Sequence, residues 1–177
     1  MALYKTEGII LGSCPFEESG KLVTVFTKEH GKISVIAKGA KRPTSRFGGR
    51  LETFSYGELL LAKGRNLDIL SQMELRESFQ SIREDHTQLN LGFYFIKIIQ
   101  AATMQRQRNP KLFKLLLLSL KKMKDGAALD YVVRFFEINL LKAEGVFRAD
   151  QLPEEIISEH LDKDIKLWKK MITSTVL

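Results

Sequence analysis

The sequence contains few of the residues from which disulfides and metal sites are built. It has one cysteine, Cys14, and three histidines, which stand far apart at positions 30, 86 and 160. One cysteine excludes an internal disulfide and a zinc site of several thiolates from this chain alone, and the scattered histidines lack metal-ligand spacing. We therefore expect a protein of a reducing compartment that holds no metal and no cofactor.

Long apolar segments are missing as well. The most apolar run, Leu115–Leu118, lies between Lys114 and Lys121 and is far shorter than the ~20 residues that cross a bilayer. The first residues alternate charged and apolar side chains and contain no stretch typical of a secretion signal. The expectation is a soluble, cytoplasmic protein without a membrane segment.

Catalytic patterns are not recognisable either. Glu17 and Glu18 are adjacent, and neighbouring residues of an extended segment point in opposite directions, which argues against an acid/base pair. The glycines between positions 39 and 49 lack the spacing of a nucleotide-binding loop. We expect a protein that is not an enzyme, because a nuclease or ligase would need a carboxylate cluster that the sequence does not suggest.

Cations, in contrast, outnumber acidic residues. The chain has 28 Lys and Arg residues against 21 Asp and Glu residues, which gives a formal net charge of +7. Such a surplus favours a polyanion as partner, because each phosphate that a cation neutralises releases a counterion. Lysines that are simply solvated would give the same total, so the positions of the cations carry more information than their number.

The chain up to about residue 80 has the alternation and the β-branched composition of strands. Glycine-containing turns separate the segments, such as Lys28–Gly31 between the second and the third. The expected strands cover residues 4–11, 22–27, 32–37, 54–62 and 67–75. Five short strands with one long loop after the third favour a small barrel of the OB-fold type, and an SH3-like barrel is the alternative that periodicity does not separate.

From about residue 81 the apolar period becomes helical. Ser81 and Glu84 have the spacing of a capping box, and the helix after them is expected to reach about residue 105. Asn109–Pro110 is typical of a helix start and Gly145 of a helix end. The sequence thus predicts an α+β protein, with a five-stranded OB-fold barrel over residues 1–80 and an all-α helical domain over residues 81–177.

The loop after the third expected strand is the main candidate for a binding site. Residues 38–50 hold five cations, no carboxylate and three glycines. Cations there could pair with backbone phosphates, and Phe47 could stack on a base. The candidate DNA-binding residues of this loop are Lys38, Lys41, Arg42, Arg46, Phe47 and Arg50. A mobile, solvated loop is the alternative that composition leaves open.

A second basic segment follows in the helical part. Residues 86–124 contain no acidic residue. The cations that would form a second basic surface are Arg106, Arg108, Lys111, Lys114 and Lys121. The alternative is that they are the solvated side of core helices.

Several segments of the chain match a known family in order and spacing. They are Tyr4–Leu11, Glu18–Ser19, Val23–Lys32, Ala37–Pro43 and Ser45–Arg46, continued by Leu51–Leu61 and Leu67–Glu74. Together they resemble the opening of the RecO family of bacterial recombination mediators. The helical part is similar mainly in pattern, with Gly145–Val146 at the place where the family has a helix that ends in glycine and an apolar residue.

The resemblance implies an OB-fold that binds single- and double-stranded DNA and promotes annealing of complementary strands. It also implies work with the partner RecR in loading recombinase at gaps, and a helical domain that receives the acidic C-terminal tail of the single-stranded-DNA-binding protein. Lys38, Lys41, Arg42, Arg46 and Arg50 match the basic region of the family. Lys28, Lys63 and Arg65 are expected as their neighbours.

One departure from the family concerns zinc. Many members carry a module of four cysteines after the glycine and aromatic position, whereas no cysteine follows Gly145–Arg148 here. The chain is thus expected to be a short form without structural zinc. The alternative function is a non-catalytic adaptor whose helical domain binds an acidic protein tail and whose barrel has little affinity for DNA.

Overall fold

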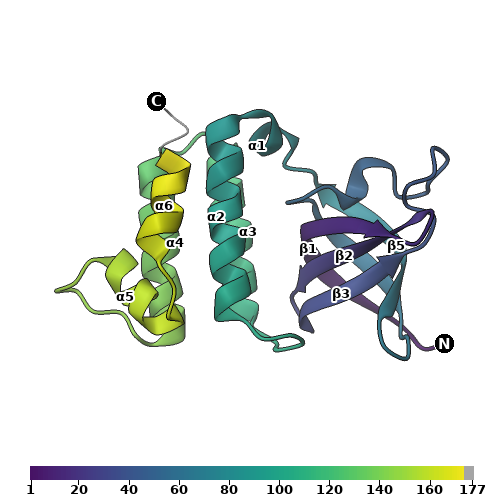
Figure 1. Ribbon diagram of the computed structural model, residues 1–177, viewed down its shortest axis with the longest axis horizontal. Helices are drawn as coiled ribbons and strands as arrows, with labels where there is room; N and C mark the ends of the chain where they lie inside the picture. Colours follow the sequence, from purple (N-terminus) through teal and green to yellow (C-terminus); the bar gives the residue numbers. More distant parts are fainter. Residues whose placement is uncertain (174–177) are drawn as a thin grey trace. The chain divides into compact units, whose positions relative to one another are not determined.

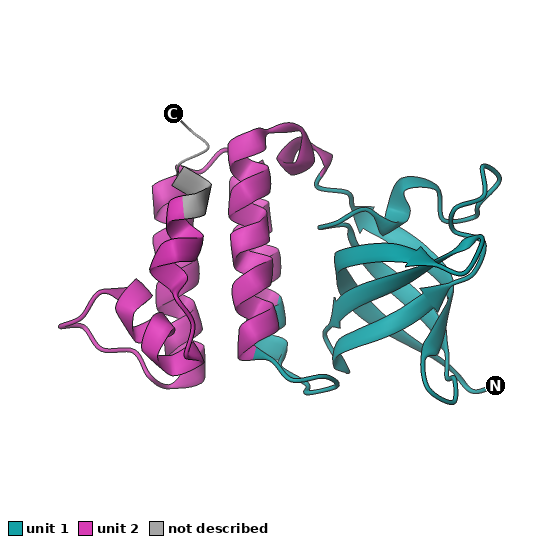
Figure 2. Cartoon of the chain, viewed as in Figure 1, with its two compact units in different colours: residues 1–79, 103–113 teal, residues 80–102, 114–177 magenta. Residues whose placement is uncertain are grey.

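The computed structural model describes the backbone of residues 1–173 and the side chains of residues 1–170. The chain forms two compact units, coloured separately in Figure 2. The barrel unit consists of Met1–Phe79 and Thr103–Phe113, and the helical unit consists of Gln80–Ala102 and Lys114–Leu177. The segment 103–113 therefore packs with the strands, although its sequence suggested a place among the helices.

Five strands close into a barrel with the order β1-β2-β3-β5-β4 (Figure 1). Their bounds are β1 (Leu3–Phe16), β2 (Gly20–Thr27), β3 (Gly31–Ala37), β4 (Tyr56–Ala62) and β5 (Asp68–Glu77). Neighbouring strands are antiparallel except β3 and β5, which pair in parallel through Val35–Asp68 and Ile36–Ile69. Alternating apolar residues of the strands fill the interior, as the period-two pattern predicted. The architecture confirms the predicted OB-fold.

Strand β1 is longer than the sequence suggested, because its first half pairs with one strand and its second half with another. Residues 3–9 pair with β4 and residues 8–16 pair with β2, with an irregularity between Ile10 and Gly12. The first strand was expected to end at residue 11, before Gly12 and Pro15, and this prediction is wrong. Pro15 is tolerated because that part of β1 pairs on one side only, so a missing N–H does not interrupt a central ladder.

Segment 103–113 is fastened to the β2–β3 end of the barrel. The Arg106 N–H donates to the Lys32 carbonyl at 2.8 Å, and the Lys32 ammonium donates to the Thr103 carbonyl at 2.9 Å. At the turn, Gly31 has φ +66°, and a Cβ there would lie 2.1 Å from the Gln107 carbonyl oxygen. The segment can approach this closely only because residue 31 has no side chain.

The helices are α1 (Gln80–Glu84), α2 (His86–Ala102), α3 (Pro110–Lys124), α4 (Leu129–Glu144), α5 (Pro153–Leu161) and α6 (Ile165–Thr173). The single helix expected from residue 81 to about 105 is divided at Asp85, whose carboxylate accepts the Gln88 N–H at 2.8 Å and so begins α2. Ser81 lies inside α1, which contradicts the predicted capping box. The predicted start at Asn109–Pro110 and the end at Gly145 are confirmed.

A buried polar cluster lies inside the helical unit. The Tyr94 hydroxyl donates to the Glu137 carboxylate at 2.7 Å, and the Lys169 ammonium lies 3.1 Å from Glu137 and 2.8 Å from Glu154. Burial and the neighbouring Glu137 carboxylate raise the pKa of Tyr94. The cluster joins α2, α4, α5 and α6, because each helix contributes one of its members. No helix in the described part of the chain is both long and apolar enough to cross a bilayer.

Candidate nucleic-acid interface

The loop between β3 and β4 is a folded structure rather than a slack connection. Successive turns close through backbone hydrogen bonds, including Arg42 N–H to Gly39 carbonyl at 3.1 Å and Ser45 N–H to Arg42 carbonyl at 2.9 Å. A short 3-10 helix, η1 (Gly48–Leu51), follows. These hydrogen bonds hold the backbone of the loop in a defined conformation.

Phe47 anchors this loop to the barrel. Its side chain is only 1% exposed and packs in the barrel core, together with the nearby Leu51. The prediction that Phe47 stacks on a base is therefore wrong, because a ring enclosed by the core offers no face to a ligand. The Arg46 guanidinium carbon lies 5.2 Å from the centre of this ring. The Phe47 ring therefore contacts both the barrel core and the side chain of the neighbouring Arg46.

The loop cations have no acidic partner. Within residues 1–170, no carboxylate forms an ion pair with Lys38, Lys41, Arg42, Arg46 or Arg50, and all five are exposed. The hydrogen bonds that two of them make go to carbonyl oxygens, from Arg50 to Arg46 at 2.6 Å and from Lys41 to Glu17 at 3.3 Å. Their positive charges remain uncompensated, which favours binding of an anion.

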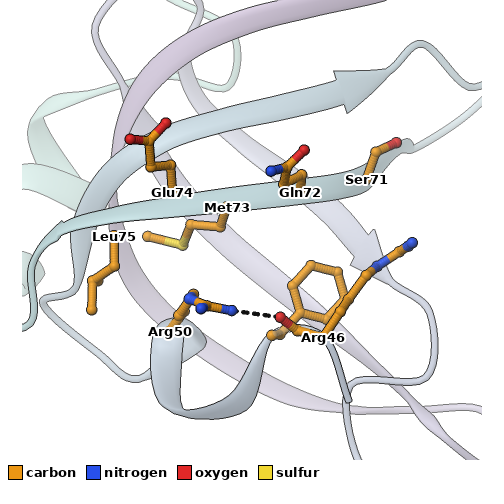
Figure 3. A pocket seen from close by; sticks show the side chains of 8 residues that line it. Arg46, Arg50, Ser71, Gln72, Met73, Glu74 and Leu75 are labelled. Atoms are coloured by element: carbon orange, nitrogen blue, oxygen red, sulfur yellow. Dashed lines mark hydrogen bonds between the residues drawn. The ribbon is translucent and has the colours of Figure 1, made fainter. Parts of the chain in front are cut away.

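The loop and strand β5 enclose a pocket of about 620 Å³ (Figure 3). It is lined by Arg46, Phe47, Arg50, Ser71, Gln72, Met73, Glu74 and Leu75. In Figure 3, Met73 and Leu75 extend from the strand toward the turn that carries Arg50, and Gln72 and Glu74 extend from its other side. We call this the β5 pocket; it combines two cations with hydroxyl and amide groups and one carboxylate.

Arg46 also lines a second pocket, of about 420 Å³. Its lining comes from the β1–β2 turn, the end of β3 and the loop: Phe16, Glu17, Ser19, Gly20, Ile36, Lys38, Gly39, Arg42 and Arg46. We call this the Phe16 pocket. Phe16 was not singled out from the sequence, because the strand that carries it was expected to end near Leu11.

Three further barrel cations were expected beside the loop, and the structure does not place them there. Lys28 lies at the β2–β3 turn, whereas the loop leaves from the opposite end of that hairpin, where Lys21 pairs with Ala37. Six residues of strand separate the two ends, or ~20 Å. Lys28 is also ion-paired with Glu7 at 3.2 Å. Lys63 and Arg65 lie in the β4–β5 turn and line neither pocket.

The expected second basic surface is divided between the two units. Arg106, Arg108 and Lys111 belong to the barrel unit, whereas Lys114 and Lys121 belong to the helical unit. Arg106 is ion-paired with Asp68 and Arg108 with Glu29, each at 3.0 Å. These two arginines hold segment 103–113 against the barrel and are not free cations like those of the loop.

Acidic and metal-binding groups are not concentrated at either pocket. The β5 pocket has Glu74 and the Phe16 pocket has Glu17 as its one carboxylate. In the part of the chain that the structure describes, no group of three or more His, Cys, Asp or Glu side chains is placed to hold a metal ion. The chemistry that both pockets offer is the binding of anionic and hydrogen-bonding groups.

Comparison with known proteins identifies the family. A sequence model described as "Recombination protein O N terminal" matches residues 1–79, and one described as "Recombination protein O C terminal" matches residues 83–147. The chain belongs to the RecO family. The first match covers the strands of the barrel, including the loop, and the second covers α2, α3 and α4.

Curated relatives agree with this assignment. The chain is 38% identical to a DNA repair protein RecO of Clostridium novyi over 146 residues, which is 82% of this chain and 57% of that protein. It is 36% identical over 145 residues to the protein of that name from Bacillus subtilis, again 82% of this chain and 57% of the relative. The corresponding protein of Halalkalibacterium halodurans is 36% identical over 143 residues, 81% of this chain and 56% of that protein. The chain thus spans little more than half the length of these relatives.

Proposed function

We propose that this RecO-family chain binds single- and double-stranded DNA through the β3–β4 loop and promotes annealing of complementary strands without altering them chemically. The observation that carries the proposal is the set of five exposed loop cations without a carboxylate partner. Other barrel cations, such as Lys28 and Arg108, are neutralised by glutamates. The loop therefore offers a phosphate chain five exposed cations that no carboxylate of the described residues neutralises.

Annealing follows from the same electrostatics. Two DNA strands repel each other through their phosphates, and cations bound to either strand lower that repulsion. Binding itself gains free energy from released counterions, so affinity falls with salt at a slope of about −0.7 per phosphate for single strands and −0.9 for duplexes. A loop fixed by Phe47 loses little conformational entropy when it binds, because its turns are already formed.

Protein partners form a second part of the proposal. We extend it to RecR, with which the chain would load recombinase at gaps, and to the acidic C-terminal tail of the single-stranded-DNA-binding protein. Support for a tail site lies in the helical unit, where the Lys122 ammonium is 4.7 Å from the centre of the Phe135 ring and 5.3 Å from that of Tyr131. A cation beside exposed aromatic surface suits a peptide that is both acidic and apolar.

The DNA-binding proposal is tested by comparing two triple variants of equal charge. Lys41→Ala/Arg42→Ala/Arg46→Ala removes three loop cations, and Arg134→Ala/Lys163→Ala/Lys166→Ala removes three exposed cations of the helical unit. Fluorescence anisotropy measures the affinity for labelled oligonucleotides, and mixing of complementary dye-labelled strands measures annealing. The loop variant should lose at least tenfold in affinity and anneal slowly, whereas the control variant should keep both within about twofold.

The adaptor alternative predicts a different pattern. Affinity for oligonucleotides would be negligible, the loop variant would behave like the control, and an acidic peptide that ends in phenylalanine would bind tightly. Incubation of labelled DNA with the protein and magnesium completes the test. Intact DNA is expected, and a cleaved or joined product would contradict the assignment of a non-catalytic role.

A further inference from the structure

The Phe16 pocket contains the aromatic ring that the loop itself does not provide. Phe16 is the last residue of β1 and pairs with Gly20, the first residue of β2. A glycine opposite leaves the neighbouring ring uncovered on that side, because it carries no side chain. The Phe16 side chain is half-buried and lines the pocket, whereas Phe47 is enclosed by the core.

The other residues that line the pocket suit both the base and the phosphate of a nucleotide. Ile36, which is half-buried, adds apolar surface beside Phe16. Lys38, Arg42 and Arg46 supply three positive charges at the same pocket, against the single carboxylate of Glu17. A volume of about 420 Å³ lies within the range of small-molecule sites, which hold ligands of nucleotide size. Apolar contact for a base and cations for its phosphates are thus side by side.

We infer that the Phe16 pocket takes one unpaired nucleotide of a single strand, with its base on the Phe16 ring and its phosphate on Arg42 or Lys38. The inference rests on the proposed function, because it places a base where the loop cations would hold the backbone. A base within a duplex is stacked and paired, so it reaches the ring only after leaving the helix, at a cost of a few kcal/mol. Phe16 therefore contributes to the binding of single strands and not to that of duplexes, whereas the loop cations contribute to both.

The β5 pocket does not offer the same chemistry. Its aromatic residue, Phe47, is buried, and its other lining groups are the polar or charged side chains of Ser71, Gln72 and Glu74 together with Met73 and Leu75. It has two cations and one carboxylate, and hydrogen-bonding groups in place of an accessible ring. We assign the base-stacking role to the Phe16 pocket for this reason.

The test combines a protein variant with a DNA variant. Phe16→Leu keeps an apolar side chain and removes the ring. Oligothymidylate longer than the ~4–16 nucleotides that an OB-fold covers is compared with an abasic strand of the same length and with a duplex. Phe16→Leu should weaken binding of oligothymidylate about tenfold, in the range for one stacked base, and change the affinity for the abasic strand and the duplex by less than twofold. Phe147→Leu, at an exposed aromatic residue of the helical unit, is the matched control and should change none of them.

A second variant gives a direct optical signal. Phe16→Trp keeps an aromatic ring, so it should retain the wild-type affinity, and its indole fluorescence should be quenched as oligothymidylate binds but not as the abasic strand binds. An equal loss for all three DNAs in Phe16→Leu, or unquenched fluorescence in Phe16→Trp at saturating DNA, would overturn the inference. Different results would contradict the proposed function: a wild-type protein that does not bind DNA, or a loop triple variant that binds DNA as well as the wild type.

Discussion

Arg106 forms an ion pair with Asp68 at 3.0 Å, although the Asp68 side chain is only 2% exposed. The same carboxylate accepts hydrogen bonds from the Tyr4 hydroxyl at 2.5 Å and from the Gly64 N–H at 3.1 Å. One buried acid on β5 thereby connects the first strand, the β4–β5 turn and segment 103–113. The cation that completes this cluster belongs to the basic segment that the sequence suggested for DNA binding.

Removal of this arginine should destabilise the barrel unit. Arg106→Ala leaves a buried carboxylate with fewer partners, and we expect a loss of about 2 kcal/mol in the free energy of unfolding. Arg108→Ala is the matched control, because its ion pair with Glu29 is exposed on both sides and is worth less than about 1 kcal/mol. Urea denaturation measures both. Equal losses in the two variants would contradict the structural role of Arg106.

The pH dependence of stability should report on Asp68. Burial alone would raise the pKa of this carboxyl, but the hydrogen bonds from Tyr4 and Gly64 and the neighbouring Arg106 outweigh burial and lower it. A carboxyl with a lowered folded-state pKa stabilises the fold above its unfolded pKa, ~3.9, and loses that contribution as the pH falls through the folded pKa.

Asp68→Asn removes the titration and keeps the shape of the side chain. The wild type should exceed it in free energy of unfolding by about 3 kcal/mol from pH 7 down to about pH 5. Below about pH 4 the difference should shrink, because the wild-type carboxyl takes up a proton. Denaturation curves collected from pH 2 to pH 7 measure this difference. A gap that grows toward low pH would show that the sign of the pKa shift is wrong.

Phe47 and Phe16 should differ in what their substitution changes. Phe47→Ala empties a core site and should cost about 3–5 kcal/mol of stability. The milder Phe47→Leu should keep the fold and reduce the affinity for oligothymidylate by less than twofold, because the ring is enclosed by the barrel core. A selective tenfold loss of single-strand affinity in Phe47→Leu, without loss of stability, would show that Phe47 is part of the binding site.

Two glycines with positive φ make a further comparison. Gly31→Ala should lower the free energy of unfolding by more than about 3 kcal/mol. The strain of a positive φ, about 1–2 kcal/mol, adds to the steric clash of a Cβ placed 2.1 Å from the Gln107 carbonyl oxygen. Gly126→Ala has φ +83° and open space around its Cβ, so it should cost the strain alone. Thermal unfolding of both variants separates the two contributions, and similar losses would show that segment 103–113 does not lie against the turn.

The sequence predicted the barrel well because its strands are short, rich in β-branched and apolar residues and separated by glycine-containing turns. It located the basic loop because glycines and cations stand out in its composition. It could not show that Phe47 is buried, since a loop aromatic looks the same whether it faces solvent or the core. Lys28 and Arg108 are residues of a type that often contacts DNA, but in the fold they form ion pairs with Glu7 and Glu29. These glutamates lie far from their partners in the sequence, so no local pattern indicates the ion pairs. The start of α2 at Asp85 could not be predicted either, because the apolar period continues across the break between α1 and α2.

The slope of the logarithm of DNA affinity against the logarithm of salt concentration tests the loop most directly. Each loop cation that binds a phosphate contributes about 0.7 to the slope for single strands. The wild type should therefore have a steeper slope than Lys41→Ala/Arg42→Ala/Arg46→Ala by about 2, while the triple variant of the helical unit keeps the wild-type slope. Identical slopes for the wild type and the loop variant would contradict the assignment of these cations to the phosphate backbone.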